Sequence, residues 1–503
     1  MSRICAVALA CATLLVAPAA AAAGGDERTL QRYAQGTWQS FVAMTDEQTG
    51  LPTDLLHGDG SRDIQTSTTN IGAYMWSAVA AERLGIIGRR ELLARMDRTV
   101  STIEAMETYA DTGQFYNWYD HRTGEKMTTD NAGEPRVPIL SSVDNAWLAV
   151  GLKIVGARVP QLRARTRAVY DAMDFGFYYR PEVNRILFHY APDTGEAPCC
   201  YDTIVSESRI AYYVGVAKGD LPSKVFYGQW RTFPDTCQYS FQETRPEGFT
   251  RTYEGQAVYE GSYPTATGRL VPSWGGSMFE ALMPPLFVPE DEWGPGSWQV
   301  NHPNTVDAQI DHGLNVAGYG VWGFSPSADT EDGYGIFGVD AVGMDPNGNA
   351  SNLEPRILVD RGFPGCPGRP ALPDPPASAY TDGVVTPHAT FLGLRWRPSE
   401  ALASLRRLER DFGAFTPWGF YDAVNVDSGK HSDSFLSLDQ GMIMAALGNA
   451  LGHDVLRRAF ATRDVERATR PAVAVEEFKC SRAAARSPAP RGATACAGPG
   501  ATT

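Results

Sequence analysis

The clearest helix in the sequence is expected over Tyr201–Asp220, which reads YDTIVSESRIAYYVGVAKGD. Its start offers small polar capping residues, its apolar residues recur at helical spacing, and a lysine and a glycine can close its end. Counting by three and four places Glu207 on the apolar face, together with Ile204 and Val214. A carboxylate on such a face is either paired or functional, because burying an unpaired charge is costly. Arg209 points elsewhere on this helix, so an ion pair with an arginine of another helix and a functional acid both remain open.

Helical periodicity recurs along most of the chain. Further helices are expected at Thr29–Met44, Thr66–Gly85, Arg90–Tyr109, Ser141–Val155, Gln161–Phe177, Ser223–Trp230, Gly275–Leu286, Asn304–Val316, Ala389–Trp396, Ser399–Phe412 and Ser434–Leu451. Between them, Asp111–Thr128 is expected to form a hairpin or an aromatic loop, Pro234–Ser273 to be irregular, and Gly318–Pro387 to be a long loop.

These elements predict an all-α protein. About a dozen helices without βαβ alternation favour a single domain over residues 24–470. The closed arrangement of that many helices is an (α/α)6 barrel, a double ring in which the long loops form a cleft at one end. A helical solenoid is the alternative, but the sequence has no fixed repeat period.

The two ends of the chain differ in composition from the rest. Residues 1–23 have the features of a signal peptide, with Arg3, an apolar stretch over Ile4–Val16 that is too short to span a bilayer, and Ala-x-Ala cleavage sites at Ala19–Ala23. We therefore expect a secreted or periplasmic protein without a membrane anchor. Residues 471–503 are rich in Ala, Arg, Pro and Gly and are expected to be disordered.

The net charge and the cysteine content limit the kinds of partner and cofactor that we expect. The net charge of −14 argues against nucleic acid, since phosphate binding needs a basic surface. The cysteines after the leader fit disulfides in an exported chain, and one of the adjacent Cys199 and Cys200 is expected to join Cys237 or Cys366. No Cys/His cluster suggests zinc, and Asp345–Asn349 lacks the glycine and glutamate of a calcium loop. No metal and no cofactor is predicted.

Several motifs follow one another along the chain. They are TSTTNIGAY (Thr66–Tyr74), GQFYNWYD (Gly113–Asp120), SSVDNAWL (Ser141–Leu148), the stretch Tyr201–Asp220, SWGGSMFEALMP (Ser273–Pro284), GFYDAVNV (Gly419–Val426) and LSLDQG (Leu436–Gly441). Together, over roughly Thr29–Leu451, they resemble the glycoamylase-like domain shared by bacterial endo-β-1,2-glucanases and the cyclising region of cyclic β-1,2-glucan synthases. The resemblance implies an (α/α)6 barrel that acts on β-1,2-linked glucose chains.

The resemblance also implies roles for particular acids. Glu207 matches the general acid of this group. Asp422 and Asp439 match acidic positions where the base or a water-positioning residue is expected, and the sequence does not choose between them. Asp144 and Glu280 fall in motifs that line the cleft.

Structural alternatives exist for three of these acids. Asp439 and Asp144 stand where helices are expected to begin, so each can simply favour the helix dipole. Glu280 can cap a helix or form an ion pair within the barrel. For Trp118, Trp274, Trp322 and Trp418, sugar stacking and core packing are about equally good explanations. Five aromatic residues are candidates for substrate binding. They are Trp118, Tyr119, Trp274, Trp322 and Tyr421.

Glycoside hydrolysis needs a protonated carboxylic acid and a second carboxylate. A glutamate on an apolar face suits the first role, because desolvation raises its pKa. The synthases have a sequence similar to W-G-I-S-E-S, whose glutamate is the expected nucleophile. This chain has Pro326 at the position of that glutamate. A retaining mechanism is therefore not expected. We expect an inverting mechanism, in which the two carboxyls lie about 6.5–9.5 Å apart.

The sequence thus predicts an exported glycoside hydrolase, an inverting endo-β-1,2-glucanase with Glu207 as general acid, acting as a monomer on a polysaccharide or oligosaccharide. Two alternatives remain open. One is a hydrolase of the same fold for another bacterial polysaccharide, because the loops that set specificity diverge most. The other is a non-catalytic glycan-binding protein.

Overall fold

The computed structural model describes residues 17–239, 242, 244–331, 333–344, 367, 383–478 and 481–482. The α-helices in this part of the chain are α1 (Ala17–Met44), α2 (Thr68–Arg83), α3 (Arg89–Ala105), α4 (Ser142–Arg158), α5 (Arg163–Ala172), α6 (Arg209–Lys218), α7 (Met278–Leu282), α8 (Glu290–Trp293), α9 (Trp298–Asp311), α10 (Pro387–Leu392), α11 (Pro398–Phe412), α12 (Ser437–Gly452), α13 (Val455–Phe460) and α14 (Arg463–Ala474).

The strands are short, apart from one hairpin. They are β1 (Leu55–His57), β2 (Gln65–Ser67), β3 (Thr108–Tyr109), β4 (Gln114–Phe115), β5 (Trp118–Asp120), β6 (Leu140–Ser141), β7 (Tyr179–Arg180), β8 (Arg185–Ile186), β9 (His189–Tyr190), β10 (Glu247–Tyr253), β11 (Gln256–Thr265), β12 (Gly268–Leu270), β13 (Ser327–Ala328), β14 (Tyr334–Gly335), β15 (Val384–Val385), β16 (Phe415–Thr416), β17 (Gly419–Phe420), β18 (Val424–Asn425), β19 (Ser434–Leu436) and β20 (Ser481–Arg482).

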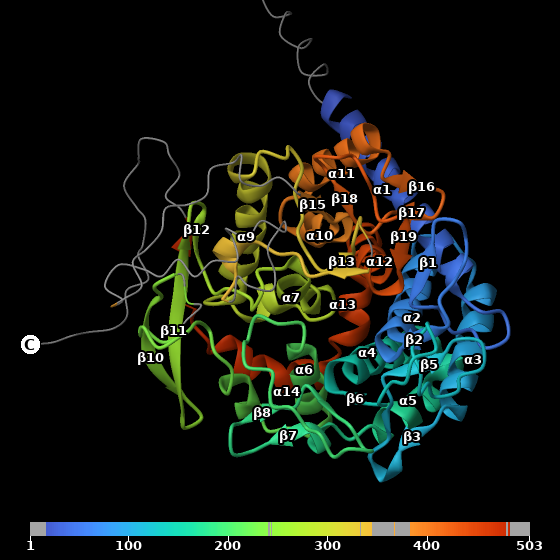
Figure 1. Cartoon of the computed structure of the whole chain (residues 1–503), viewed down its shortest axis with the longest axis horizontal. Coiled ribbons are helices and arrows are strands. Elements are labelled where there is room, and N and C mark those ends of the chain that lie inside the picture. Colours follow the sequence, from blue (N-terminus) through green and yellow to red (C-terminus); the bar gives the residue numbers. More distant parts are fainter. Residues whose placement is uncertain are drawn as a thin grey trace, which may run out of the picture.

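The centre of the molecule is a row of helices that are buried on nearly every side (Figure 1). Helix α2 packs against both α4 and α12, α6 packs on α4, and α10 packs on both α12 and α7. A helix that is apolar all round has to lie inside a protein, which is why these segments carry few charges. We call α2, α4, α6, α7, α10 and α12 the inner helices.

A second set of helices covers the inner ones. Helix α3 packs on α2, α5 on α4, α14 on α6, α9 on α7, α11 on α10 and α1 on α12. These outer helices are amphipathic, as α11 illustrates with a buried stripe of Ala401, Leu402, Leu405 and Leu408 and a charged opposite face. The protein is therefore helix-rich and layered, as expected from the sequence.

Close approach of two inner helices depends on glycine. A Cβ atom added at Gly72 of α2 would lie 2.5 Å from the carbonyl oxygen of Trp147 in α4, and one added at Gly151 would lie 2.9 Å from the Cα atom of Gly72. Larger side chains at these positions would separate α2 from α4.

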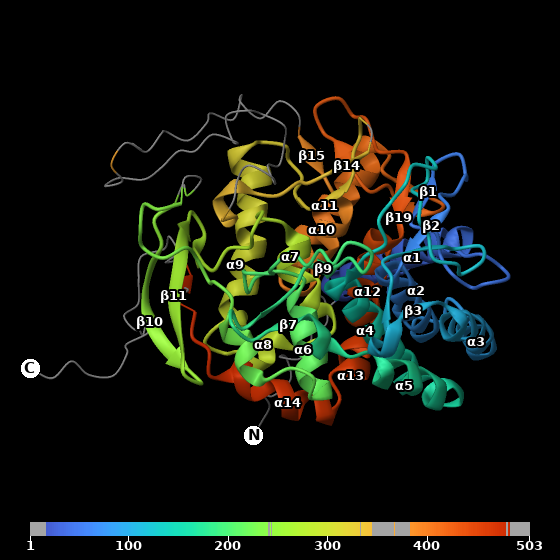
Figure 2. The ribbon, with the colours of Figure 1, turned by 60° about the horizontal axis from the view of Figure 1, so that its bottom comes forward.

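The inner helices begin at one end of the molecule. Strands β2, β6 and β19 run directly into α2, α4 and α12, and β15 precedes α10 by one residue. In Figure 2, β1, β2, β14 and β15 lie toward one end of the helices, and α13 and α14 lie at the other. First-turn side chains of different inner helices are brought together in this way.

Helix α6 is shorter than the sequence predicts. It spans Arg209–Lys218, and Gly219, with a φ of 85°, closes it as expected. Upstream, Thr203 pairs with Trp230 and the Ile204 amide donates to the Trp230 carbonyl, so this backbone is bonded sideways rather than along a helix. Glu207 consequently stands before the helix, and its expected place on an apolar helical face is wrong.

The segment expected to be irregular, Pro234–Ser273, contains the largest sheet. Strands β10, β11 and β12 are antiparallel and β20 joins β12, so that the sheet lies at one edge of the molecule beside α9 (Figure 1). Its turn carries positive φ angles at Glu254 and Gly255. The expected helix at Ser223–Trp230 is a 3-10 helix over Ser223–Tyr227 only.

Packed structure continues past residue 470, where the domain was expected to end. Helix α14 reaches Ala474, and Glu476 and Phe478 are buried. Apart from β20, the expected tail beyond Phe478 lies outside the described residues, as do most of the expected signal peptide and the segment Asp345–Asn349.

The structure pairs Cys199 with Cys200 as a vicinal disulfide. This pairing differs from the expected link of one of them to Cys237, and Cys366 lies outside the described residues. Within the described ranges, no helix has both the length and the apolar character needed to cross a bilayer. Over the same ranges, no three histidine, cysteine or acidic side chains are grouped as metal ligands.

Candidate active site

Six acidic residues gather where the inner helices begin, and we call them the carboxyl cluster. They are Asp54 before β1, Asp144 in α4, Glu207 before α6, Glu280 in α7, Asp422 between β17 and β18, and Asp439 in α12. Neighbouring members are close enough to raise one another's pKa, as Glu280 does for Glu207 and Asp439 does for Asp422. The sequence predicted five of the six.

Glu207 is the member best suited to hold a proton. Burial, followed by the charge of Glu280, raises its pKa to about 7. The Ser206 hydroxyl donates to its carboxylate at 3.1 Å, and no cation pairs with it among the residues that the structure describes. The side chain remains partly exposed. The alternative of an ion pair with an arginine of another helix is thus not what the structure shows there.

The nearby arginine is committed elsewhere. Arg209 and Glu290 are fully buried and form a bidentate ion pair, with N–O distances of 2.7 and 3.0 Å. His302 Nε2 also lies 3.0 Å from Glu290. Burial opposes ionisation of Glu290, but Arg209 and His302 together hold its pKa at about 2. This pair is structural, and it leaves Glu207 without a guanidinium partner.

Glu280 caps α7. Its carboxylate accepts hydrogen bonds from the hydroxyls of Ser273 and Ser277, at 3.0 and 2.8 Å, and from the Gly275 amide, while the Ser277 hydroxyl accepts from the Glu280 amide. This reciprocal arrangement is a capping box. The capping alternative raised from the sequence is therefore observed, and the charge so fixed also acts on Glu207.

Asp422 and Asp439 form a buried pair, each 1% exposed. The Leu436 amide donates to Asp422 Oδ2 at 2.7 Å. Burial and the Asp439 charge raise the pKa of Asp422 well above its usual range. Burial also raises the pKa of Asp439, and there His388, with Nδ1 at 3.1 Å from Oδ2, acts in the opposite direction.

The remaining two acids are held by polar side chains. Asp144 lies in the first turn of α4, as expected, and Thr69 donates to it at 2.6 Å. Asp54 accepts from the side-chain amides of Asn70 at 2.7 Å and Gln65 at 2.9 Å. Burial is the first cause that raises the pKa of both carboxyls.

Tyr334 reaches the carboxyl cluster from the hairpin β13–β14. The residue is 56% exposed, while burial of its hydroxyl and the charges of Asp439, Asp54, Glu207 and Asp422, in that order, raise its pKa well above the usual range. One hydroxyl thus lies within electrostatic reach of four members of the cluster. Glu207 and the pair formed by Asp422 and Asp439 therefore belong to a single site.

The aromatic candidates divide into two groups. Trp118, Trp274 and Tyr421 are partly exposed, and Tyr421 stacks on Phe435 at 5.0 Å. Tyr119 and Trp322 are 0% and 1% exposed, which places both in the core. We leave these last two out of the proposed site.

Asp54, His388 and Tyr334 are not among the residues predicted from the sequence. None of the three falls in one of the motifs that carry the resemblance. They are recognised only because the fold places them beside the expected acids.

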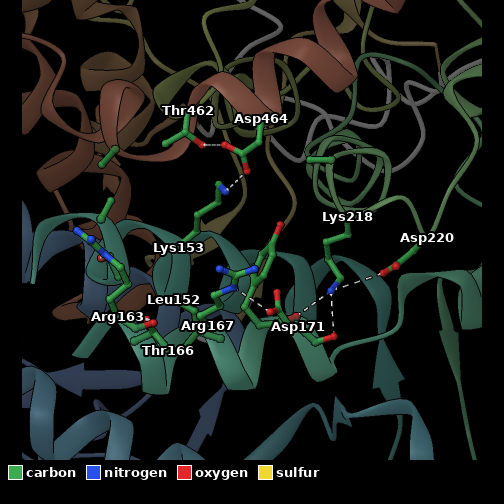
Figure 3. Close-up of a pocket in the computed structure, with 15 residues that line it drawn as sticks. Leu152, Lys153, Arg163, Thr166, Arg167, Asp171, Lys218, Asp220, Thr462 and Asp464 are labelled. Atoms are coloured by element: carbon green, nitrogen blue, oxygen red, sulfur yellow. Dashed lines mark hydrogen bonds and ion pairs between the residues drawn. The ribbon is translucent and has the colours of Figure 1, made fainter. Parts of the chain in front are cut away.

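A separate cavity of about 610 Å³ lies at the opposite ends of α4 and α6, between α5 and the segment joining α13 to α14 (Figure 3). Lys153 pairs there with Asp464 at 2.9 Å, and Lys218 donates to the carbonyl oxygen of Tyr170 at 2.9 Å. These cations already have protein partners. None of the carboxyl cluster lines this cavity.

Two family models match the chain. The family described as "Putative glucoamylase" matches residues 201–463, and the one described as "Protein of unknown function (DUF3131)" matches residues 32–212. The cyclic β-(1,2)-glucan synthase NdvB of Rhizobium meliloti (strain 1021) is 24% identical, over 86% of this chain and 18% of that protein. The chain thus spans less than a fifth of that relative's length.

Solved structures share the fold. An endo-β-1,2-glucanase from Chitinophaga pinensis, in complex with sophorotriose and glucose, matches with a TM-score of 0.62 and 17% identity, over 88% of this chain and 96% of that one. A β-1,2-glucanase from Parabacteroides distasonis matches with a TM-score of 0.64 and 16% identity, over 90% and 60%. The resemblance drawn from the motifs is confirmed, and because the first family model covers more than half of the sequence, the chain belongs to the glycoamylase family.

Proposed function

We propose that this chain is an exported glycoside hydrolase that cleaves β-1,2-linked glucan internally and with inversion at the anomeric carbon. One observation carries the proposal. Glu207, whose pKa is raised to about 7, shares a site with the buried pair Asp422 and Asp439. Hydrolysis of a glycosidic bond needs one protonated carboxyl and one carboxylate, and this site supplies both kinds.

Glu207 acts as the general acid. With a pKa near 7, a large fraction of its carboxyl groups is protonated at neutral pH, and the proton passes to the glycosidic oxygen as the bond to the anomeric carbon breaks. Its partial exposure lets a substrate oxygen approach. Glu280 serves this step indirectly, since its charge helps to keep Glu207 protonated.

The aspartate pair supplies the base. One of the two carboxylates removes a proton from a water molecule whose oxygen attacks the anomeric carbon from the opposite face of the sugar. Pro326 stands where the resemblance to the synthases would place a nucleophilic glutamate. A proline side chain cannot attack carbon, and this supports water as the nucleophile and hence inversion.

The choice of glucan rests on the relatives. The solved structures of similar fold include endo-β-1,2-glucanases, and the curated relative is a cyclic β-(1,2)-glucan synthase. The partly exposed Trp118, Trp274 and Tyr421 offer aromatic faces on which glucose rings can stack. We propose a β-1,2-glucan chain as the substrate, bound by one copy of the protein.

We further propose that the inner and outer helices form an (α/α)6 barrel. Contacts link α6, α4, α2, α12, α10 and α7 in that order. Between α6 and α7, Arg209 donates to the carbonyl oxygens of Glu280 and Ala281 at 2.8 and 2.6 Å. This bridge supports closure of the inner ring.

The test is incubation of the mature protein with β-1,2-, β-1,3-, β-1,4- and α-linked glucans, followed by chromatography of the products. Short β-1,2-linked oligosaccharides that are absent with Glu207→Gln would support both substrate and acid. Cleavage of a different glucan alone would overturn the substrate. If no glucan is cleaved but β-1,2-glucan binds equally to wild type and Glu207→Gln, the protein is a glycan-binding protein and the hydrolase proposal fails.

A further inference from the structure

In the part of the chain that the structure describes, an imidazole lies beside one member of the aspartate pair, Asp439. His388 is the second residue of α10, and its Nδ1 atom lies 3.1 Å from Asp439 Oδ2. The two side chains are 0% and 2% exposed, so solvent does not screen this contact. At Asp422 the closest donor is instead the Leu436 amide, at 2.7 Å from Oδ2. The two aspartates therefore have different partners although they lie together.

Two buried carboxyls that lie within electrostatic reach of each other do not readily ionise together, because each negative charge disfavours the other. The other groups that face the pair are Asp54, which adds to the negative field, the Gln440 side chain, which hydrogen-bonds Asp422, and the Tyr334 hydroxyl. None of these three supplies a positive charge. Near neutral pH, the pair is therefore expected to keep one proton, and its surroundings decide which aspartate holds it.

We propose that His388 is a positioning residue that keeps Asp439 as the ionised member of the pair, while Asp422 retains the shared proton. The imidazole of His388, whose Nδ1 atom lies 3.1 Å from Oδ2, favours negative charge on Asp439 and so lowers the pKa of that carboxyl. Asp422 in its protonated form can still accept the hydrogen bond from the Leu436 amide.

Resting on the proposed function, this assigns the base. The Asp439 carboxylate takes a proton from water, the water oxygen bonds to the anomeric carbon, the glycosidic bond breaks, and its oxygen takes the proton of Glu207. The two carboxyls exchange their protonation states and no other reactant is needed. Asp422 does not change its protonation state in this sequence.

A substrate-free test measures urea unfolding of wild type, H388Q, D439N and the double variant. If His388 stabilises the Asp439 charge, H388Q lowers the urea midpoint more in wild type than in the D439N background. The loss is also larger at pH 7 than at pH 4, because Asp439, whose pKa burial raises, takes up a proton as the pH falls. Equal losses in both backgrounds and at both pH values would overturn the proposal. H312Q, which removes a buried imidazole packed edge-on against Phe324 at 5.0 Å, is the control for cavity effects.

The kinetic test compares D422N with D439N on the glucan that wild type cleaves. Asn is isosteric with a protonated aspartic acid and can donate like one. D439N is therefore expected to lose about 10³-fold in kcat, and D422N roughly tenfold. In H388Q the pKa of Asp439 rises, so the acidic limb of the plot of kcat against pH moves to higher pH by about one unit. A larger loss for D422N, or an unmoved limb in H388Q, would contradict the assignment.

The two proposals fail in different ways. If wild type cleaves none of the glucans, the proposed function falls, and the urea cycle still decides whether His388 and Asp439 are coupled. If wild type is active and the cycle shows no coupling, the function stands and the role of His388 falls.

Discussion

Glu207 owes its raised pKa to two features of its surroundings. Burial contributes most, and the Glu280 carboxylate contributes next. The nearby guanidinium of Arg209 does not cancel these two effects, because it forms its ion pair with Glu290. At the scale of a residue, the raised pKa of Glu207 thus depends on the position of Arg209 as well as on the contacts of Glu207 itself.

Replacing Glu207 by Gln should abolish proton donation while preserving the fold. We expect kcat to fall about 10²–10⁴-fold, the range for loss of a general acid. The thermal midpoint should stay the same or rise slightly, because Gln removes a buried titratable group. Steady-state kinetics beside thermal unfolding would check this. Loss of activity together with loss of the folded state would leave the acid role unsupported.

Glu280→Gln should move the pH profile rather than abolish activity. Removing this charge lowers the pKa of Glu207, so the acid loses its proton at lower pH. The alkaline limb of the kcat/KM profile should then shift to lower pH by roughly half a unit to one unit. Ser277→Ala weakens the same cap but keeps the charge, and its limb should not move. A shift in both variants would attribute the effect to the cap.

At the scale of elements, Arg209 ties the start of α6 to α7. Its guanidinium spans Glu290, the carbonyl oxygens of Glu280 and Ala281, and that of Ser206. These bonds hold the loop that carries Glu207 against the element that carries Glu280. The geometry of the acid therefore depends on a residue that takes no part in the chemistry.

Arg209→Met should destabilise the protein by about 3–5 kcal/mol, because Glu290 is then buried without its partner. The folded pKa of Glu290, about 2, lies below its ordinary 4.5. The pair's stabilisation is therefore present above about pH 4.5 and is lost as the pH falls toward 2. Urea unfolding at pH 7 and pH 3 would measure both effects. Arg410→Met, at an exposed ion pair with Asp411, should change little. Equal effects in the two variants would contradict this.

Elements could be predicted from the sequence where local and tertiary signals agree. Helices α2, α4 and α12 lie within three residues of expectation, because their apolar residues recur and a serine stands just before α2 and α4 and at the first position of α12. The start of α6 was misjudged because Ile204 and Val205 are buried without being helical. Their apolar spacing reflects pairing with Trp230, which lies far along the chain. The β10–β11 hairpin was missed because its strands alternate weakly and contain glycines.

At the scale of the whole molecule, the described residues after α14 pack on the side of the molecule where the sheet of β10, β11 and β12 lies. Glu476 forms a buried ion pair with Arg231, Phe478 packs on Trp298, and β20 adds a strand to β12. Burial raises the pKa of Glu476 to about 7. Residues that the composition marked as tail are thus part of the packed structure.

A chain ending at residue 474 should be less stable than one ending at residue 482. The shorter chain leaves Arg231 buried with only the more distant Glu260 charge, which costs about 3–5 kcal/mol. Urea unfolding of the two shortened chains would test this. Equal stabilities would mean that the segment after α14 contributes nothing to the fold.

The candidate site could be predicted in part, for a reason that concerns the whole fold. Five acids stood in recognisable motifs, but Asp54, His388 and Tyr334 join them from three distant segments. Nothing local distinguishes these three, and only convergence of the inner helix ends and the β13–β14 hairpin brings them together. Tyr119 and Trp322 show the opposite case, in which suitable residue types are turned into the core.

The measurement that tests the central claim most directly is the anomeric configuration of the newly formed reducing ends. Proton NMR would follow the first minutes of β-1,2-glucan hydrolysis by the wild-type protein, with Glu207→Gln as the control. An inverting enzyme with Glu207 as acid and an aspartate as base should release α-anomers first, and the variant should release none. β-Anomers appearing first, or product formation unchanged in Glu207→Gln, would contradict the account.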